Sequence, residues 1–161
     1  MTLQEVSQQA RELISRDGYH VPLLFVEGTK QTGVALLDLS QASDVRFLYM
    51  RTLGQQIARD KRHGDLQQLF MVSEAWMAMS ADGKLPLHRP SQDPHRIEGL
   101  IISQLTVAGR KCDLAIFRMV RDSAGQLTDL KAIDLPHAGV AESPLLDAFL
   151  EGYAQATTPT H

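Results

Sequence analysis

Five residues near the middle of the sequence carry side chains suited to acid–base chemistry or to binding an anion. Glu74 lies inside the apolar stretch LQQLFMVSEAWMAMS, and a proline-rich segment after it supplies His88, Asp93, His95 and Arg96. A carboxylate on an apolar strand is costly unless it is paired or hydrogen-bonded, so Glu74 requires a partner. A small enzyme could use Glu74 as its acid–base group beside the loop residues, with Arg96 at the pocket mouth for an anionic substrate.

A structural role for Glu74 is nevertheless favoured over a catalytic one. Ion pairs and hydrogen bonds that only stabilise a fold perturb carboxylates as active sites do, and an arginine or a backbone amide would suffice as partner. The spacing His88-x6-His95, with Asp93 between, matches no established zinc motif such as His-Glu-x-x-His. We therefore expect no metal and no cofactor, and Glu74, His88, Asp93 and His95 remain candidate catalytic residues only.

Three other motifs fail at positions that their chemistry requires. Ser73 lacks the Gly-x-Ser-x-Gly elbow of a serine nucleophile, and no base can be assigned to Cys112. The spacing Gly28-x4-Gly33 begins like a phosphate-binding loop, but Val34 and Ala35 stand where lysine and serine or threonine are needed. No complete catalytic or nucleotide-binding motif is found.

Composition sets the broad class of the protein. The chain has 161 residues, of which 43% are hydrophobic and 22% charged, as in an ordinary single-domain globular protein. The net charge of −3 is spread evenly along the chain. The one local basic run, Arg59, Lys61, Arg62 and His63, is typical of a helix C-terminus, so we expect no nucleic-acid partner. No signal peptide and no apolar run of about 20 residues is found, so we expect a soluble, cytoplasmic protein that does not bind membranes.

Periodicity and turn residues predict the elements that must position these side chains. Helical spacing is found over 2–17, 43–62 and 143–153, and strand patterns over 21–27, 33–39, 66–80, 98–108, 113–121 and 127–135. The first helix begins with the capping-box pair Thr2 and Glu5. The second has a predicted buried stripe of Val45, Leu48, Tyr49, Leu53 and Ile57.

The order α-β-β-α-β-β-β-β-α, with short connections, predicts an α+β domain. We expect a mostly antiparallel sheet of five to six strands with helices packed on it. A half-open barrel that curls around one helix is the alternative. A single domain should span residues 1–155, followed by a polar C-terminal tail at 156–161.

Three segments, VPLLFVEG, VSEAWMA and DPHRIEGLIIS, resemble a small family of uncharacterised bacterial proteins. The resemblance implies no activity, cofactor or partner. The missing motifs favour a non-enzymatic accessory, binding or assembly protein that acts through a protein partner or as a homo-oligomer such as a homodimer. The alternative is a small enzyme or anionic-ligand binder built on Glu74 and the loop at 81–96.

Overall fold

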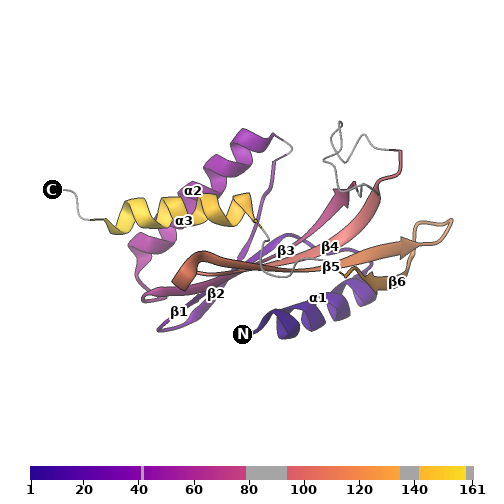
Figure 1. The fold of residues 1–161 in the computed structure, drawn as a ribbon, viewed down its shortest axis with the longest axis horizontal. Coiled ribbons are helices and arrows are strands. Elements are labelled where there is room, and N and C mark those ends of the chain that lie inside the picture. Colours follow the sequence, from indigo (N-terminus) through magenta and orange to yellow (C-terminus); the bar gives the residue numbers. More distant parts are fainter. Residues whose placement is uncertain (41, 79–93, 135–141, 159–161) are drawn as a thin grey trace.

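The computed structural model describes residues 1–40, 42–78, 94–134 and 142–158, and shows the predicted α+β fold (Figure 1). Three α-helices are present in these ranges: α1 Leu3–Asp17, α2 Ser43–Asp60 and α3 Pro144–Thr157. The strands are β1 Leu23–Gly28, β2 Thr32–Leu36, β3 Leu66–Met77, β4 Ile97–Thr106, β5 Lys111–Arg121 and β6 Leu127–Ala132. Helix α3 thus includes residues 156 and 157, which the sequence assigned to a polar tail.

All six strands form one open antiparallel sheet in the order β2-β1-β3-β4-β5-β6. The half-open barrel is therefore wrong, because β2 and β6 are the two ends of the sheet and do not pair with each other. Strand β3 lies inside the sheet, as its apolar sequence predicts. In its register with β4, Val72 lies opposite Ile102 and Glu74 opposite Leu100.

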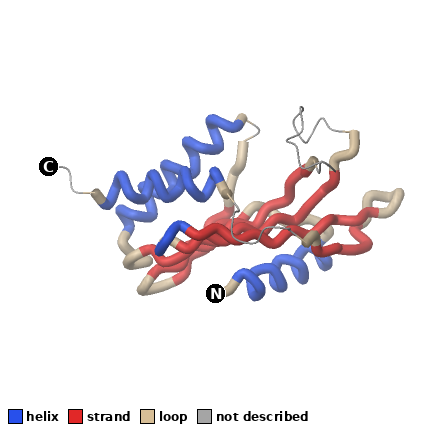
Figure 2. The backbone as a smooth tube through the Cα atoms, viewed as in Figure 1, coloured by secondary structure: helices blue, strands red, loops and turns tan. Residues whose placement is uncertain are grey.

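The sheet separates two apolar cores. Helix α1 covers one face, and the pair α2 and α3 covers part of the other (Figure 2). On the α1 side, Val6 and Ile14 pack with Phe70 and Val72 of β3. On the opposite side, Leu69 packs with residues of α2 and α3, as alternation along a strand requires.

Local sequence signals place the ends of α1 as predicted. The Thr2 side chain accepts a hydrogen bond from the Glu5 backbone N–H, and the Glu5 carboxylate accepts one from the Thr2 N–H. Gly18 follows the helix with φ 79°, a left-handed conformation that glycine adopts without steric cost.

Helix α3 starts with Ser143 as N-cap and proline at the first turn, although the serine side chain makes no capping hydrogen bond.

The predicted buried stripe of α2 is partly wrong. Val45 is 48% exposed and Leu48 is 61% exposed, whereas Met50 and Gly54 are buried. The reason is the close contact with α3: a Cβ atom at Gly54 would overlap the Phe149 carbonyl. The buried side of α2 is thus set by where its backbone can approach α3.

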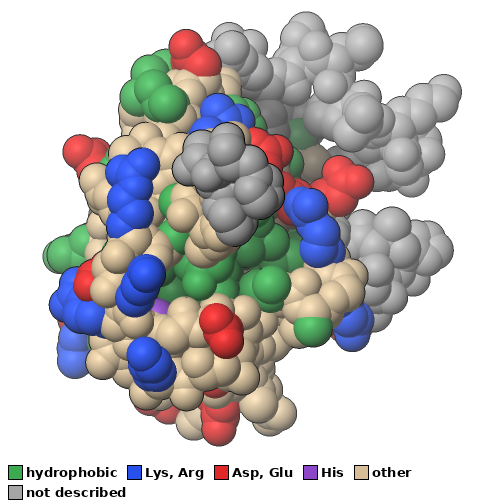
Figure 3. Space-filling model, turned by 90° about the vertical axis from the view of Figure 1, so that its left-hand side faces the viewer, with side chains coloured by type: hydrophobic (Ala, Val, Ile, Leu, Met, Phe, Trp, Pro, Cys, Tyr) green, Lys and Arg blue, Asp and Glu red, His purple; other side chains and the backbone are tan. Residues whose placement is uncertain are grey.

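Figure 3 views the end of the molecule that lies at the left in Figure 1. Hydrophobic side chains gather in the middle of this face, and Lys and Arg side chains lie among Asp and Glu side chains around them. Charges of the two signs are therefore interspersed over this part of the described surface. Among the described helices, none is long and apolar enough to cross a membrane.

Candidate functional site

Glu74 is held by a backbone amide. Phe70 and Val72 belong to the core beneath α1, so Glu74, two residues further along β3, lies on the same face. Its Oε1 accepts a hydrogen bond from the backbone N–H of His20, just beyond the end of α1. A backbone amide is one of the two partners that the structural interpretation of Glu74 allowed.

Burial raises the pKa of the Glu74 carboxyl group above its usual value. The His20 N–H acts in the opposite direction, the negative charge of Glu98 adds to the increase, and the positive charge of Arg121 opposes it. The sequence analysis had named neither Glu98 nor Arg121. Glu98 lies near the start of β4 and Arg121 at the end of β5, so only the hairpin register brings them together.

Arg121 joins Glu98 to the end of α1. Its Nε and Nη2 donate to the two carboxylate oxygens of Glu98 at 2.7 and 2.9 Å, and its Nη1 donates to the Gly18 carbonyl at 3.1 Å. These bonds, with that of Glu74 to His20, attach the residues after α1 to three strands. These hydrogen bonds fix the end of α1 to the sheet, because Glu74, Glu98 and Arg121 all bond to groups of the protein itself.

The loop residues predicted to accompany Glu74 are only partly described. His88 and Asp93 lie outside the described residues, so their role as candidate catalytic groups stays a prediction. His95 is exposed. The Arg96 guanidinium lies 4.6 Å from the centroid of the Trp76 ring, at the end of the β3–β4 pair. Glu74 lines neither the cavity of about 1010 Å³ beside α1 nor the cavity of about 190 Å³ beside His63.

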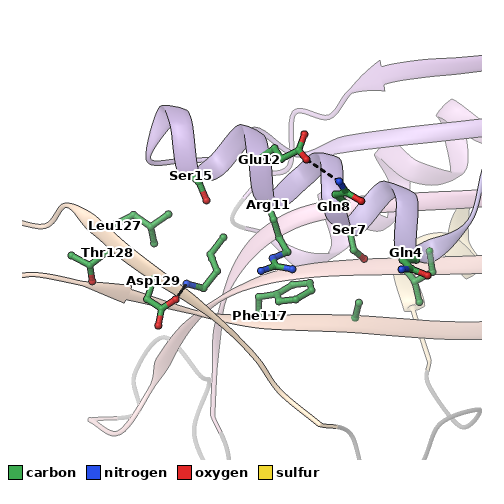
Figure 4. Close-up of a pocket in the computed structure, with 13 residues that line it drawn as sticks. Gln4, Ser7, Gln8, Arg11, Glu12, Ser15, Phe117, Leu127, Thr128 and Asp129 are labelled. Atoms are coloured by element: carbon green, nitrogen blue, oxygen red, sulfur yellow. Dashed lines mark hydrogen bonds between the residues drawn. The ribbon is translucent and has the colours of Figure 1, made fainter.

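A groove of about 1010 Å³ lies instead between α1 and strands β5 and β6, and we call it the α1 groove (Figure 4). Its helical wall carries polar side chains, among them Gln4, Ser7 and Arg11. Phe117 of β5 and Leu130 of β6 are among the apolar residues opposite. Its volume is in the range of sites that hold small molecules.

Two side chains of the α1 groove, buried Ser7 and exposed Arg11, have polar groups that form no hydrogen bond or ion pair with a described residue. Ser7 is only 6% exposed, and its Oγ makes no hydrogen bond with a described residue. Arg11, one helical turn later, extends over the Phe117 ring with 4.9 Å between the guanidinium carbon and the ring centroid (Figure 4). No carboxylate of the described chain forms an ion pair with Arg11.

The sequence analysis missed the α1 groove. The available signal was Ser7, which lies beside Val6 and Ala10 on the buried side of an amphipathic helix and interrupts its apolar stripe. A polar residue in such a position needs a partner, but the sequence of α1 alone does not show that β6 leaves space beside it.

Metal binding and cysteine chemistry gain no support from the described residues. No group of three or more His, Cys, Asp or Glu side chains in these ranges is placed to hold a metal ion. Cys112 is buried, and burial, with smaller effects of the Asp147 and Asp113 charges, raises the pKa of its thiol. A raised pKa decreases the thiolate fraction that a nucleophile needs.

The sheet order and the placement of the helices define a small α+β domain, in which an open antiparallel sheet lies between one helix and a helix pair. The chain belongs to the family of bacteriophage lambda protein ea47, whose family model matches residues 1–151. The family is thus a phage family, where the sequence motifs had suggested a bacterial one. No curated protein and no solved structure matches the chain.

Proposed function

We propose that the protein is a non-enzymatic assembly protein that acts as a homodimer, in which the β2 strands of two copies pair antiparallel. The observation that carries the proposal is the composition of the β2 edge. β2 is an end strand, so one side of its backbone is not paired within the sheet. Its sequence TGVAL contains no charge and no proline, while Val34 is 60% exposed and Leu36 is 71% exposed.

Protein sheets protect their end strands with charges, prolines or covering elements, because an exposed apolar edge pairs with other chains. The other end strand, β6, follows this rule, since it carries Asp129 and Lys131. On its face of the sheet, helix α1 lies over β3 to β6 and not over β2 (Figure 2). On the other face, the Tyr49 hydroxyl of α2 donates to the Leu36 carbonyl. The β6 edge is therefore protected by charged side chains, whereas the β2 edge has the composition of a strand that pairs with another chain.

Exposed apolar surface continues beside β2. The Leu37 N–H donates to the Pro22 carbonyl at 2.9 Å, which places the segment before β1 next to the end of β2. Val21 in that segment is 46% exposed. A partner that covers β2 would also remove part of this surface from water, which is favourable in proportion to the apolar area buried.

Charge complementarity points to a second copy of the chain as the partner. Antiparallel pairing about a two-fold axis at Val34 would place residue 30 of one copy opposite residue 38 of the other. These residues are Lys30 and Asp38, both exposed, and no ion pair of the described chain uses either. The same register places Thr32 of each copy opposite Leu36 of the other.

The test is the mass of the protein in solution, measured by light scattering over a range of concentrations. We expect a dimer for the unaltered chain and a monomer for Val34→Lys, because lysine places a charge at the two-fold axis. Leu48→Lys is the matched control, since Leu48 is equally exposed but lies on α2. An unaltered chain that stays monomeric at all concentrations contradicts the proposal.

A charge exchange tests the register. Lys30→Glu should weaken the dimer because it places a second carboxylate opposite Asp38, and addition of Asp38→Lys should restore it. A dimer that survives Val34→Lys and shows no such rescue would use another surface, and the proposed β2 interface would be wrong.

A further inference from the structure

We infer that the α1 groove is a binding site for an amphipathic molecule with a single negative charge, of the chemical class of a medium-chain monocarboxylate. The inference is independent of the proposed dimer, because β6 and β2 are opposite ends of the sheet. It rests on the shape of the groove and on two of its side chains. Among the described residues, the buried Ser7 hydroxyl has no hydrogen-bond partner and the exposed Arg11 guanidinium has no counter-ion.

The buried hydroxyl is the first indication of a ligand. A hydroxyl group removed from water without a hydrogen bond costs free energy, so buried polar groups in proteins are nearly always paired. Ser7 is an exception within the described chain, and it lines the groove. A ligand oxygen that accepts a hydrogen bond from its Oγ would remove this cost.

The charge of the ligand follows from Arg11. Two carboxylates line the groove, and neither pairs with Arg11: Glu12 Oε1 accepts from Gln8 Nε2 at 3.0 Å, and Asp129 Oδ1 accepts from the Leu130 N–H at 2.8 Å. Arg11 therefore remains to bind an anion. The negative charges of the same two carboxylates repel a dianion about twice as strongly as a monoanion, so the site favours a monoanion over a phosphate.

The body of the ligand follows from the opposite wall. Phe117, Leu127 and Leu130 present apolar side chains to the groove, and Figure 4 shows Leu127 on the β6 side facing the helix. An apolar chain placed against them would be removed from water while its charged end reached Arg11 and Ser7. One short hydrocarbon chain with one carboxylate meets both requirements.

The experiment compares three probes with the same eight-carbon chain: octanoate, octan-1-ol and octyl phosphate. Binding is followed by titration calorimetry and by the backbone amide chemical shifts of the intact chain. We expect octanoate at millimolar concentration to shift amides of α1, β5 and β6 around the groove, and to bind more tightly than the other two probes. An octanoate titration without shifts at the groove overturns the inference, and tighter binding of octyl phosphate overturns the assignment of a monoanion.

Two arginine variants separate the charge from the fold. Arg11→Gln should weaken octanoate binding about three- to tenfold and leave octanol binding unchanged, because only the ion pair is lost. Arg16→Gln is the control, since Arg16 lies on the same helix but pairs with Asp17 outside the groove. Equal octanoate affinity in Arg11→Gln and the unaltered chain would show that Arg11 does not bind the carboxylate, and would overturn the inference.

Discussion

The carboxylate of Glu74 and the backbone N–H of His20, 54 residues apart in the sequence, form a hydrogen bond that fixes the end of α1 to the sheet. The acid that attracts attention in the sequence as a catalytic candidate is thus engaged in holding two elements together. Its position explains why a carboxylate is tolerated on an apolar strand, because an accepted hydrogen bond offsets part of the cost of burial.

The substitution Glu74→Gln should be mild. The glutamine carbonyl can still accept the His20 N–H, and no buried arginine loses its only partner, so we expect the free energy of unfolding to change by less than about 1 kcal/mol. Glu74→Leu leaves the N–H without an acceptor and should cost about 1–3 kcal/mol. Chemical denaturation measures the unfolding free energy of both variants. Equal losses of stability in Glu74→Gln and Glu74→Leu would contradict the role of the hydrogen bond.

Glu74 should also give a characteristic pH dependence. Because burial raises its pKa in the folded state, the folded protein binds this proton more tightly than the unfolded chain. Its contribution to stability is therefore fully present below the unfolded pKa and is lost as the pH rises through the raised pKa. In Glu74→Gln, the unfolding free energy should fall less over this interval than in the unaltered chain; identical pH profiles would show that the carboxyl pKa is not raised.

Arg121→Gln should destabilise the protein by about 1–3 kcal/mol, because it removes hydrogen bonds to both Glu98 and the Gly18 carbonyl. Arg16→Gln provides the contrast. The Arg16 side chain is 69% exposed in its pair with Asp17, and exposed ion pairs contribute about 0–1 kcal/mol. Thermal unfolding measures both, and hydrogen exchange of residues 18–20 should increase only in Arg121→Gln.

Gly152→Ala should separate α2 from α3. A Cβ atom at Gly152 would overlap the Arg51 carbonyl, so the helices must move apart at an expected cost of about 1–3 kcal/mol. Gln56→Ala changes an exposed residue of α2 and should be neutral or slightly stabilising, because alanine has the better helix propensity. Unfolding in urea distinguishes the two, and a neutral Gly152→Ala would show that the close approach is not required.

Ser7→Ala should stabilise the protein, which is unusual for a buried polar residue. Removal of an unpaired hydroxyl recovers its desolvation cost, about 1 kcal/mol or more. Ser15→Ala corrects for the better helix propensity of alanine, because Ser15 is exposed on the same helix. A loss of stability in Ser7→Ala, relative to Ser15→Ala, would mean that the hydroxyl has a partner.

The sequence by itself determined the elements whose signals are local. The capping box at Thr2 and Glu5, the end of the first helix at Asp17 and the alternation along β3 depend on neighbouring residues, and the structure confirms them. The antiparallel sheet also followed from short connections, which permit little else.

Only the tertiary structure decided which residues meet across the chain. Val45 and Leu48 have the spacing of a buried stripe. They are exposed because α2 turns the side that carries Gly54 toward α3, where the two backbones come close together. The partner of Glu74 is a backbone N–H, which every residue except proline possesses, so residue type carries no signal for it. The α1 groove likewise depends on the distance between a helix and a strand more than 100 residues away in sequence, because contacts between surfaces depend on packing geometry and not on local spacing.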